Sequence, residues 1–206
     1  MSAFLGPIHS WLYHKIRLQE ELVQAVLQIA KENCRFDNIE EKVAQECGVL
    51  ESGNLEDIVD ENNIHGWLQE RVSLVEKRLA YAVTLLAKED EGNIELVKEA
   101  AFRFGKAHAV NSDAGVREAY THLENMLLNG MPCDQVNHIL YEEDNRMKWE
   151  QTVDIHAKYW NMAGGDNAHY NWIRESLIRG ILEGSRVEFD QEDKNVFVMQ
   201  IRANMI

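Results

Sequence analysis

The sequence predicts a mainly α-helical protein: a helical bundle with one internally duplicated long helix and a small β-hairpin near its C-terminal end. Apolar residues recur at helical spacing over long stretches, and only two prolines interrupt the 206 residues. One of these apolar-periodic stretches occurs twice. The composition agrees, because 45% hydrophobic and 27% charged residues are ordinary for a globular chain. We expect a single helical-bundle domain over residues 1–206.

The duplicated stretch is a long helix predicted over residues 7–32 and again over residues 63–89. Both copies open with the pattern Ile-His-x-Trp-Leu and close with Ala-Lys-Glu. The opening patterns align at an offset of 56 residues and the closing ones at an offset of 57. At the first offset the aligned pairs include His9/His65, Trp11/Trp67, Leu12/Leu68 and Glu20/Glu76. One residue is therefore inserted in the second copy, and we expect a local bulge or register shift near residues 75–78.

Local signals set the limits of the first elements. Pro7 suits the start of a helix, where a missing backbone N–H costs nothing, and Asn33 ends the pattern. Asn63 is a good N-cap for the second copy. Two shorter helical patterns, Asn38 to Glu46 and Leu55 to Val59, lie between the copies and are separated by turn residues. We interpret residues 34–62 as a connection.

Four further helical segments are expected downstream. They are Ile94 to Ala109, Asp113 to Leu128, Asp134 to about Trp160, and Ala168 to Leu182. The third contains a polar stretch that predicts a kink or an exposed middle. The segment Ala163-Gly164-Gly165-Asp166-Asn167 is the clearest loop in the chain.

The period changes in the tail. Apolar residues alternate on both sides of the turn-like residues 190–195, which predicts a β-hairpin over about residues 186–201. A lone hairpin is marginally stable in water, so it should pack on the helices or pair with another subunit. Apolar residues on both of its faces favour an interface, and we therefore expect a homo-oligomer.

Charge and hydropathy exclude several partners. A net charge of −14 argues against nucleic acid and against an anionic membrane surface, because both require a basic protein field. No apolar run approaches the roughly 20 residues that span a bilayer, and the first residues do not resemble a secretory signal. We expect a cytoplasmic protein.

The repeated histidines and glutamates are the first candidate site. In each copy the His, the Glu and the apolar stripe share one helix face. Imidazole and carboxylate groups near a bundle core are metal ligands, so His9, His65, Glu20 and Glu76 could bind a metal. Antiparallel copies would bring each His level with the other copy's Glu, whereas parallel copies would bring the two histidines together. The alternative is structural: each imidazole closes the core by bonding a helix-end carbonyl.

Further residues extend this hypothesis. Trp11 and Trp67 flank the two histidines and could contact a cofactor such as a tetrapyrrole. Downstream, His138, Glu142 and His156 are additional candidate metal or acid–base residues, although surface i,i+4 pairing explains the first two equally well. No Glu-x-x-His pair of the di-iron bundle type occurs, which argues against a metal site of that type.

Three function classes remain open. The first is a binding protein that holds a small ligand, a metal ion or a tetrapyrrole being candidates, near His9 and His65. The second is a metal-dependent or acid–base enzyme that uses the downstream histidines and carboxylates. The third is a non-catalytic subunit that serves assembly. No glycine-rich phosphate loop or nucleophile motif selects among these classes.

Overall fold

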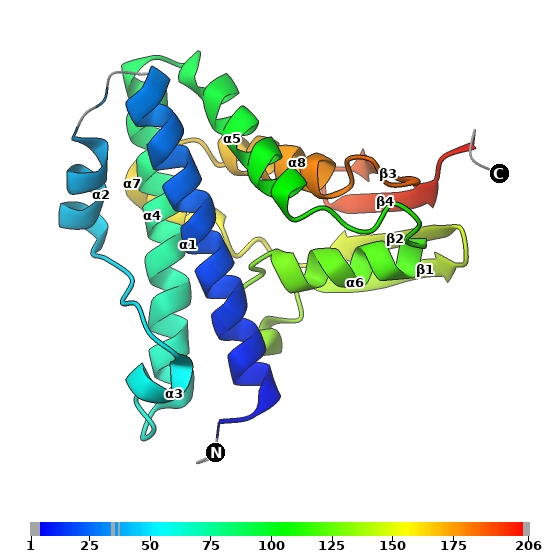
Figure 1. Cartoon of the computed structure of the whole chain (residues 1–206), viewed down its shortest axis with the longest axis horizontal. Helices are drawn as coiled ribbons and strands as arrows, with labels where there is room; N and C mark the ends of the chain where they lie inside the picture. The colour runs from blue at the N-terminus through cyan, green and yellow to red at the C-terminus, as the bar shows by residue number, and fades with distance from the viewer. Residues whose placement is uncertain (1–4, 34–35, 37, 204–206) are drawn as a thin grey trace.

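The computed structural model describes residues 5–33, 36 and 38–203 (Figure 1). Its helices are α1 (Pro7–Asn33), α2 (Ile39–Cys47), α3 (Leu55–Ile58), α4 (Ile64–Glu89), α5 (Asn93–Ala107), α6 (Val116–Met126), the 3-10 helix η1 (Pro132–Asp134), α7 (Ala157–Ala163) and α8 (Asn167–Ile181). Its strands are β1 (Asn137–Glu143), β2 (Arg146–Gln151), β3 (Val187–Asp193) and β4 (Val196–Ile201). The prediction of a mainly α-helical protein is confirmed.

The two long helices α1 and α4 lie side by side and run in the same direction (Figure 1). They have 27 and 26 residues, close to the predicted limits, and Asn63 caps α4 by accepting a hydrogen bond from the Gly66 N–H. A parallel pair needs a long connection, which α2 and α3 provide. Because α4 is continuous α-helix, the bulge expected near residues 75–78 is not found.

Helices α5 and α8 cross in direct backbone contact. A Cβ atom added to Gly105 would overlap the Leu177 carbonyl, and one added to Gly180 would overlap the Phe102 carbonyl. The Val110 N–H beyond α5 also donates to the Ile181 carbonyl at the end of α8. These two helices therefore pack more closely than larger side chains would permit.

The long helix predicted from Asp134 to Trp160 is wrong. Only η1 and α7, at its two ends, are helical, and β1 and β2 form an antiparallel hairpin between them. The polar stretch interpreted as a kink contains the hairpin turn at Asp144 and Asn145. Met147 and Trp149 are buried while Lys148 between them is not, which is the two-residue period of a strand. The helix expected from Asp113 begins only at Val116.

The tail forms the predicted hairpin, β3 and β4, but the hairpin is half of a larger sheet. The strand order is β1-β2-β4-β3, with antiparallel neighbours throughout, so β4 is an inner strand. Figure 1 shows α6 lying across the sheet. The ring of Trp149 on β2 packs against Tyr120 of α6 and against Phe189 and Phe197 of the hairpin. The apolar face of the hairpin is therefore covered within the same chain.

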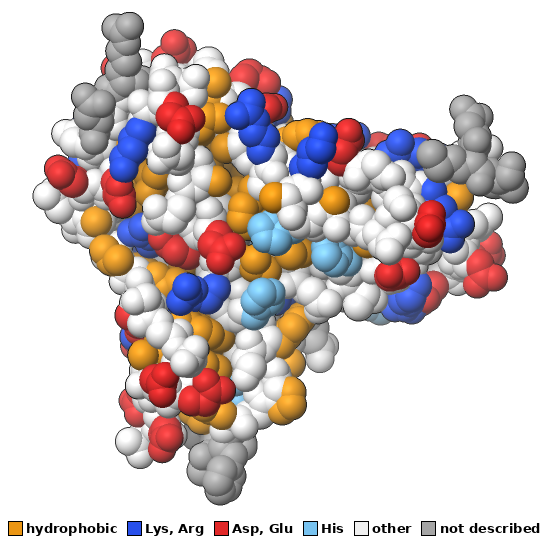
Figure 2. Space-filling model, viewed as in Figure 1, with side chains coloured by type: hydrophobic (Ala, Val, Ile, Leu, Met, Phe, Trp, Pro, Cys, Tyr) orange, Lys and Arg blue, Asp and Glu red, His pale blue; other side chains and the backbone are white. Residues whose placement is uncertain are grey.

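Buried apolar side chains form two clusters. The larger joins the C-terminal halves of α1 and α4 to α5, α6, α7, α8 and the sheet. The smaller joins the N-terminal halves of α1 and α4 to Leu55, Leu128 and Met131. On the face drawn in Figure 2, acidic and basic side chains are interspersed. Within the described ranges, no helix has the length and apolar character needed to cross a membrane.

Candidate functional site

The duplicated histidines meet at the N-terminal ends of α1 and α4. Their ring centroids are 5.4 Å apart and the rings are nearly perpendicular. This is the parallel alternative, and the antiparallel one is wrong. His9 is buried and its Nδ1 accepts a hydrogen bond from the Gly6 N–H at 2.9 Å. His65 is exposed, although the sequence places it on the face of the apolar stripe. The corresponding N–H in the second copy, that of Asn62, bonds Asp60 instead.

The two tryptophans lie in different surroundings. Trp67 is buried against Tyr13 and beneath the Arg71 guanidinium, 4.0 Å from its ring centroid. Trp11 is partly exposed, and its indole N–H donates to Asn125 Oδ1 at 2.8 Å. The two tryptophans therefore take part in separate contacts.

The two glutamates pair with residues other than the duplicated histidines. Glu20 accepts two hydrogen bonds, of 2.8 and 2.9 Å, from the buried Arg78 guanidinium of α4. Glu76, which is 1% exposed, accepts from His156 Nδ1 at 3.0 Å. The ion pair between Glu20 and Arg78 therefore links α1 to α4. The hydrogen bond between His156 and Glu76 links α4 to the start of α7.

The Glu76–His156 contact continues into a buried polar chain. His156 Nε2 lies 2.7 Å from the Tyr170 hydroxyl, and Tyr170 in turn hydrogen-bonds with the buried Arg174. A carboxylate can only accept, so Nδ1 carries a hydrogen, and in the neutral ring Nε2 accepts from Tyr170. Burial raises the pKa of the Tyr170 hydroxyl above its ordinary value and lowers the pKa of Arg174. A carboxylate and a guanidinium thus stand at opposite ends of one chain.

The other downstream candidates lie elsewhere. His138 and Glu142 are exposed on the edge strand β1, and Glu142 forms an ion pair with Arg117 of α6. His156 belongs instead to the hydrogen-bonded chain that contains Glu76 and Tyr170. Across residues 5–33, 36 and 38–203, no group of three or more His, Cys, Asp or Glu side chains is arranged to hold a metal ion. The predicted metal residues are therefore dispersed over at least three places.

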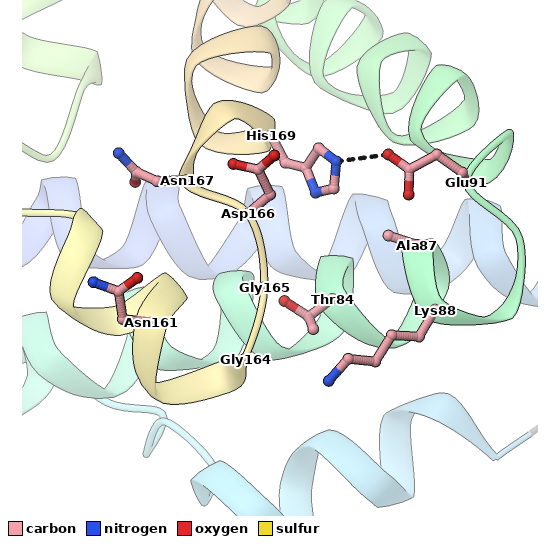
Figure 3. Close-up of a pocket in the computed structure, with 10 residues that line it drawn as sticks. All are labelled: Thr84, Ala87, Lys88, Glu91, Asn161, Gly164, Gly165, Asp166, Asn167 and His169. Atoms are coloured by element: carbon pink, nitrogen blue, oxygen red, sulfur yellow. Dashed lines mark hydrogen bonds and ion pairs between the residues drawn. The ribbon is translucent and has the colours of Figure 1, made fainter.

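A cavity lies where the turn between α7 and α8 crosses α4 (Figure 3). We call it the His169 pocket; it has a volume of about 550 Å³. Its lining residues are Thr84, Ala87, Lys88, Glu91, Asn161, Gly164, Gly165, Asp166, Asn167 and His169. The sequence identified the glycine turn as a loop, but gave no sign that Thr84 and Lys88 of α4 would lie beside it.

The glycine turn fits this place because its backbone lies directly on α4. Gly164 has a φ of +65°, in the left-handed region, and ends α7. A Cβ at Gly165 would overlap Thr84 Oγ1. Asp166 then caps α8 by accepting from the Ala168 N–H at 2.8 Å. These contacts place the first turn of α8 beside the last two turns of α4.

Three side-chain atoms of the pocket are buried without a hydrogen-bond partner: Thr84 Oγ1, Asn167 Oδ1 and His169 Nδ1. The Asn167 amide donates to Asp154 Oδ2 at 3.0 Å, which orients its oxygen as the free acceptor. His169 Nε2 lies 2.9 Å from Glu91 Oε1, so the neutral ring leaves Nδ1 as an acceptor. Buried polar atoms without partners cost about 1–3 kcal/mol each, and native proteins rarely leave them so.

No protein-family model, curated protein or solved structure matches the chain.

Proposed function

We propose that the protein binds a small polar ligand in the His169 pocket. The observation that supports this is the gathering of three buried, unpartnered polar atoms around one cavity of about 550 Å³. A ligand that hydrogen-bonds with them relieves the cost of their burial. Cavities of this size, with a few polar groups in the wall, suit small molecules.

The polar groups favour a ligand with a donor end and an anionic end. Asn167 Oδ1 and His169 Nδ1 accept hydrogen bonds, and the Asp166 carboxylate adds negative charge beside them. Lys88 runs beneath the glycine turn (Figure 3), with its Nζ 3.4 Å from the place of a Gly164 Cβ. A protonated amine at the acceptors and a carboxylate at Lys88 satisfy both ends. An α-amino acid is the simplest molecule of this class.

A thermal-shift measurement with the twenty L-amino acids tests the proposal. A ligand at a hundred times its Kd adds about 2.7 kcal/mol to the free energy of unfolding. In a chain of this length that raises Tm by roughly 5–10 °C. Ethanolamine, which lacks the carboxylate, and acetate, which lacks the amine, should give much smaller shifts. If none of the twenty compounds raises Tm, the proposed class is wrong.

Matched variants locate the binding. Lys88→Met and Asn167→Ala should each weaken the affinity about tenfold or more, because each removes one anchoring hydrogen bond or charge. The controls are Lys98→Met, a half-buried lysine of α5 that pairs with Glu95 outside the pocket, and Asn62→Ala, an exposed turn residue. An amino acid whose affinity is the same in all four variants binds somewhere other than the His169 pocket.

A second candidate function is acid–base chemistry at Glu76. Its Oε1 is unpartnered and lines a separate cavity of about 340 Å³, together with Ser73 and Tyr159, whose hydroxyls are 3.1 Å apart. The chain through His156 provides a route for the proton that a carboxyl group gains or loses. Carbodiimide coupling of glycine ethyl ester should then label Glu76 in the native chain. Labelling of exposed carboxylates with Glu76 fully protected would contradict this function.

The remaining expectations are retained as proposals. The parallel contact of α1 and α4, with the two Ile-His-x-Trp-Leu patterns level, supports their origin by duplication. A single domain, a cytoplasmic location and a homo-oligomer are proposed on the sequence grounds given above. Sedimentation velocity of the purified chain tests the last, since a monomer at all concentrations contradicts it.

A further inference from the structure

A buried lysine lies in a second, independent cavity. Lys15, on α1, is 3% exposed, and the described part of the chain gives its ammonium group no hydrogen bond or ion pair. Its Nζ lies over the face of Trp11, 4.1 Å from the ring centroid. Lysines are almost never fully buried without a charged partner, so this position needs an explanation beyond packing.

Other unpartnered polar atoms surround the same cavity, which we call the Lys15 cavity. It has a volume of about 280 Å³ between α1, α6 and the segment that precedes β1, and Lys15, Trp11, Glu124, Asn129 and Asn137 are among its lining residues. Both amide atoms of Asn129 are buried without partners. Asn137 donates to Glu124 Oε1 at 2.6 Å, which leaves its buried Oδ1 as a free acceptor. One amine, one complete amide and one acceptor therefore line the same cavity.

The amine is also unusually reactive for a lysine. Burial lowers the pKa of Lys15 from 10.5 to about 8, against the opposing charge of Glu124. At pH 7 roughly a tenth of such groups are neutral, compared with about 0.03% for an ordinary lysine. The neutral amine is the nucleophile that attacks carbonyl carbon. The Trp11 indole, held by Asn125, forms a fixed apolar wall beside it.

We propose that Lys15 forms a reversible imine with a small hydroxyaldehyde or hydroxyketone in this cavity. The neutral Nζ adds to the carbonyl carbon, and the carbonyl electron pair moves to oxygen. A proton passes from nitrogen to that oxygen, and the resulting carbinolamine loses water to give the C=N bond. One amine and one carbonyl thus yield one imine and one water, with no change of oxidation state.

The groups that line the Lys15 cavity determine which carbonyl compounds fit. A hydroxyl group on the ligand can donate to Asn137 Oδ1 or to Asn129 Oδ1 and accept from Asn129 Nδ2. The Glu124 carboxylate lines the same space, so an anionic carbonyl compound is disfavoured. The volume limits the ligand to a few carbon atoms, below the usual range of drug-sized pockets.

Reductive trapping with glycolaldehyde and cyanoborohydride tests this on the unaltered chain. The reagent supplies hydride to the imine, and peptide mass spectrometry locates the hydroxyethyl group that remains. We expect Lys15 to be labelled at least tenfold faster than exposed lysines such as Lys31, and faster than the α-amino group, whose pKa is similar. Labelling in urea should remove the difference. Equal rates for Lys15 and the exposed lysines in the native chain would overturn the proposal.

Two variants distinguish ligand binding in the Lys15 cavity from the reactivity of the Lys15 amine alone. Asn129→Leu keeps the branched shape of the side chain but removes the amide, so trapping at Lys15 should slow severalfold while trapping at Lys31 is unchanged. An unchanged rate at Lys15 means that the cavity does not hold the ligand, which also overturns the proposal. Lys15→Arg should abolish the fast-reacting site and leave all other labels in place.

Discussion

Replacing Glu76 by glutamine tests whether the buried chain from Glu76 to Arg174 holds the protein together. The substitution keeps the shape of the side chain but removes its charge, at a position that is 1% exposed. A hydrogen bond to a charged group contributes about 1.5–3 kcal/mol, against about 0.5–1.5 for a neutral pair, so roughly 1 kcal/mol is lost at His156. The amide N–H2 group takes the place of Oε1, which is already unpartnered, so no further hydrogen bond is lost there.

The buried Arg174 guanidinium also loses the negative charge at the far end of its chain. Breaking a directly paired buried ion pair costs about 3–5 kcal/mol, but two neutral groups separate these charges, so we expect a smaller share. Together these effects predict a destabilisation of about 1–3 kcal/mol. Urea unfolding followed by circular dichroism should show the midpoint falling by roughly 0.5–1.5 M, with an m-value near 2 kcal/mol/M.

The matched control is Glu175→Gln, which removes the same charge from an exposed i,i+4 pair with Arg179. That change should alter stability by less than about 0.5 kcal/mol. If Glu76→Gln is equally mild, the carboxylate is not coupled to Arg174 through His156 and Tyr170, and the reasoning fails.

Three further outcomes are expected. The folded-state pKa of Lys15 is lowered to about 8, so the unfolded chain binds more protons than the folded chain between about pH 8 and 10.5. This residue therefore makes the free energy of unfolding rise with pH over that range, by up to about 3 kcal/mol. Lys15→Met should lose that rise when unfolding is measured at several pH values, and an unchanged pH profile refutes the prediction. Gly180→Ala should destabilise the protein by about 1–3 kcal/mol or more, because its methyl group overlaps a backbone carbonyl of α5, and urea unfolding measures it; a neutral result means that the helices separate easily. Deleting residues 186–206 removes the inner strand β4 and uncovers Trp149, so aggregation or lost stability should appear in light scattering, whereas a truncated chain as soluble and stable as the parent contradicts the sheet's role.

Local signals were sufficient for the long helices but not for the region before α7. The limits of α1 and α4 follow from Pro7, Asn63 and an unbroken apolar period, all of which act within a few residues. Strand β2 instead pairs with β4, which is far away in the sequence, and β1 pairs only with β2. Because the edge strand β1 is exposed along nearly its whole length, its sequence lacks the alternation of a half-buried strand and resembles a polar helix segment.

The candidate sites were predictable only in part, for a similar reason. His9 and His65 were placed together under the parallel alternative because equivalent positions of parallel copies must meet. The partner of Glu76 lies 80 residues further along the chain, and no spacing rule connects it with His156. Thr84 and Lys88 follow the ordinary pattern of a half-buried helix. Their importance arises only when the glycine turn lies across them.

The glycine contact between α5 and α8 has a mechanical consequence for the His169 pocket. Where carbonyls of one helix meet the Cα atoms of the other, neither helix can slip by a turn without a collision. Glu91 lies two residues before α5 and His169 lies in the first turn of α8, so their hydrogen bond joins two helices that move as one rigid piece. Any opening of the pocket must then come from α4 or from the turn at Gly164 and Gly165. The side of the pocket at α5 and α8 is therefore fixed, and the side formed by α4 and the glycine turn can move. The unpartnered hydroxyl of Thr84 lies on the movable side.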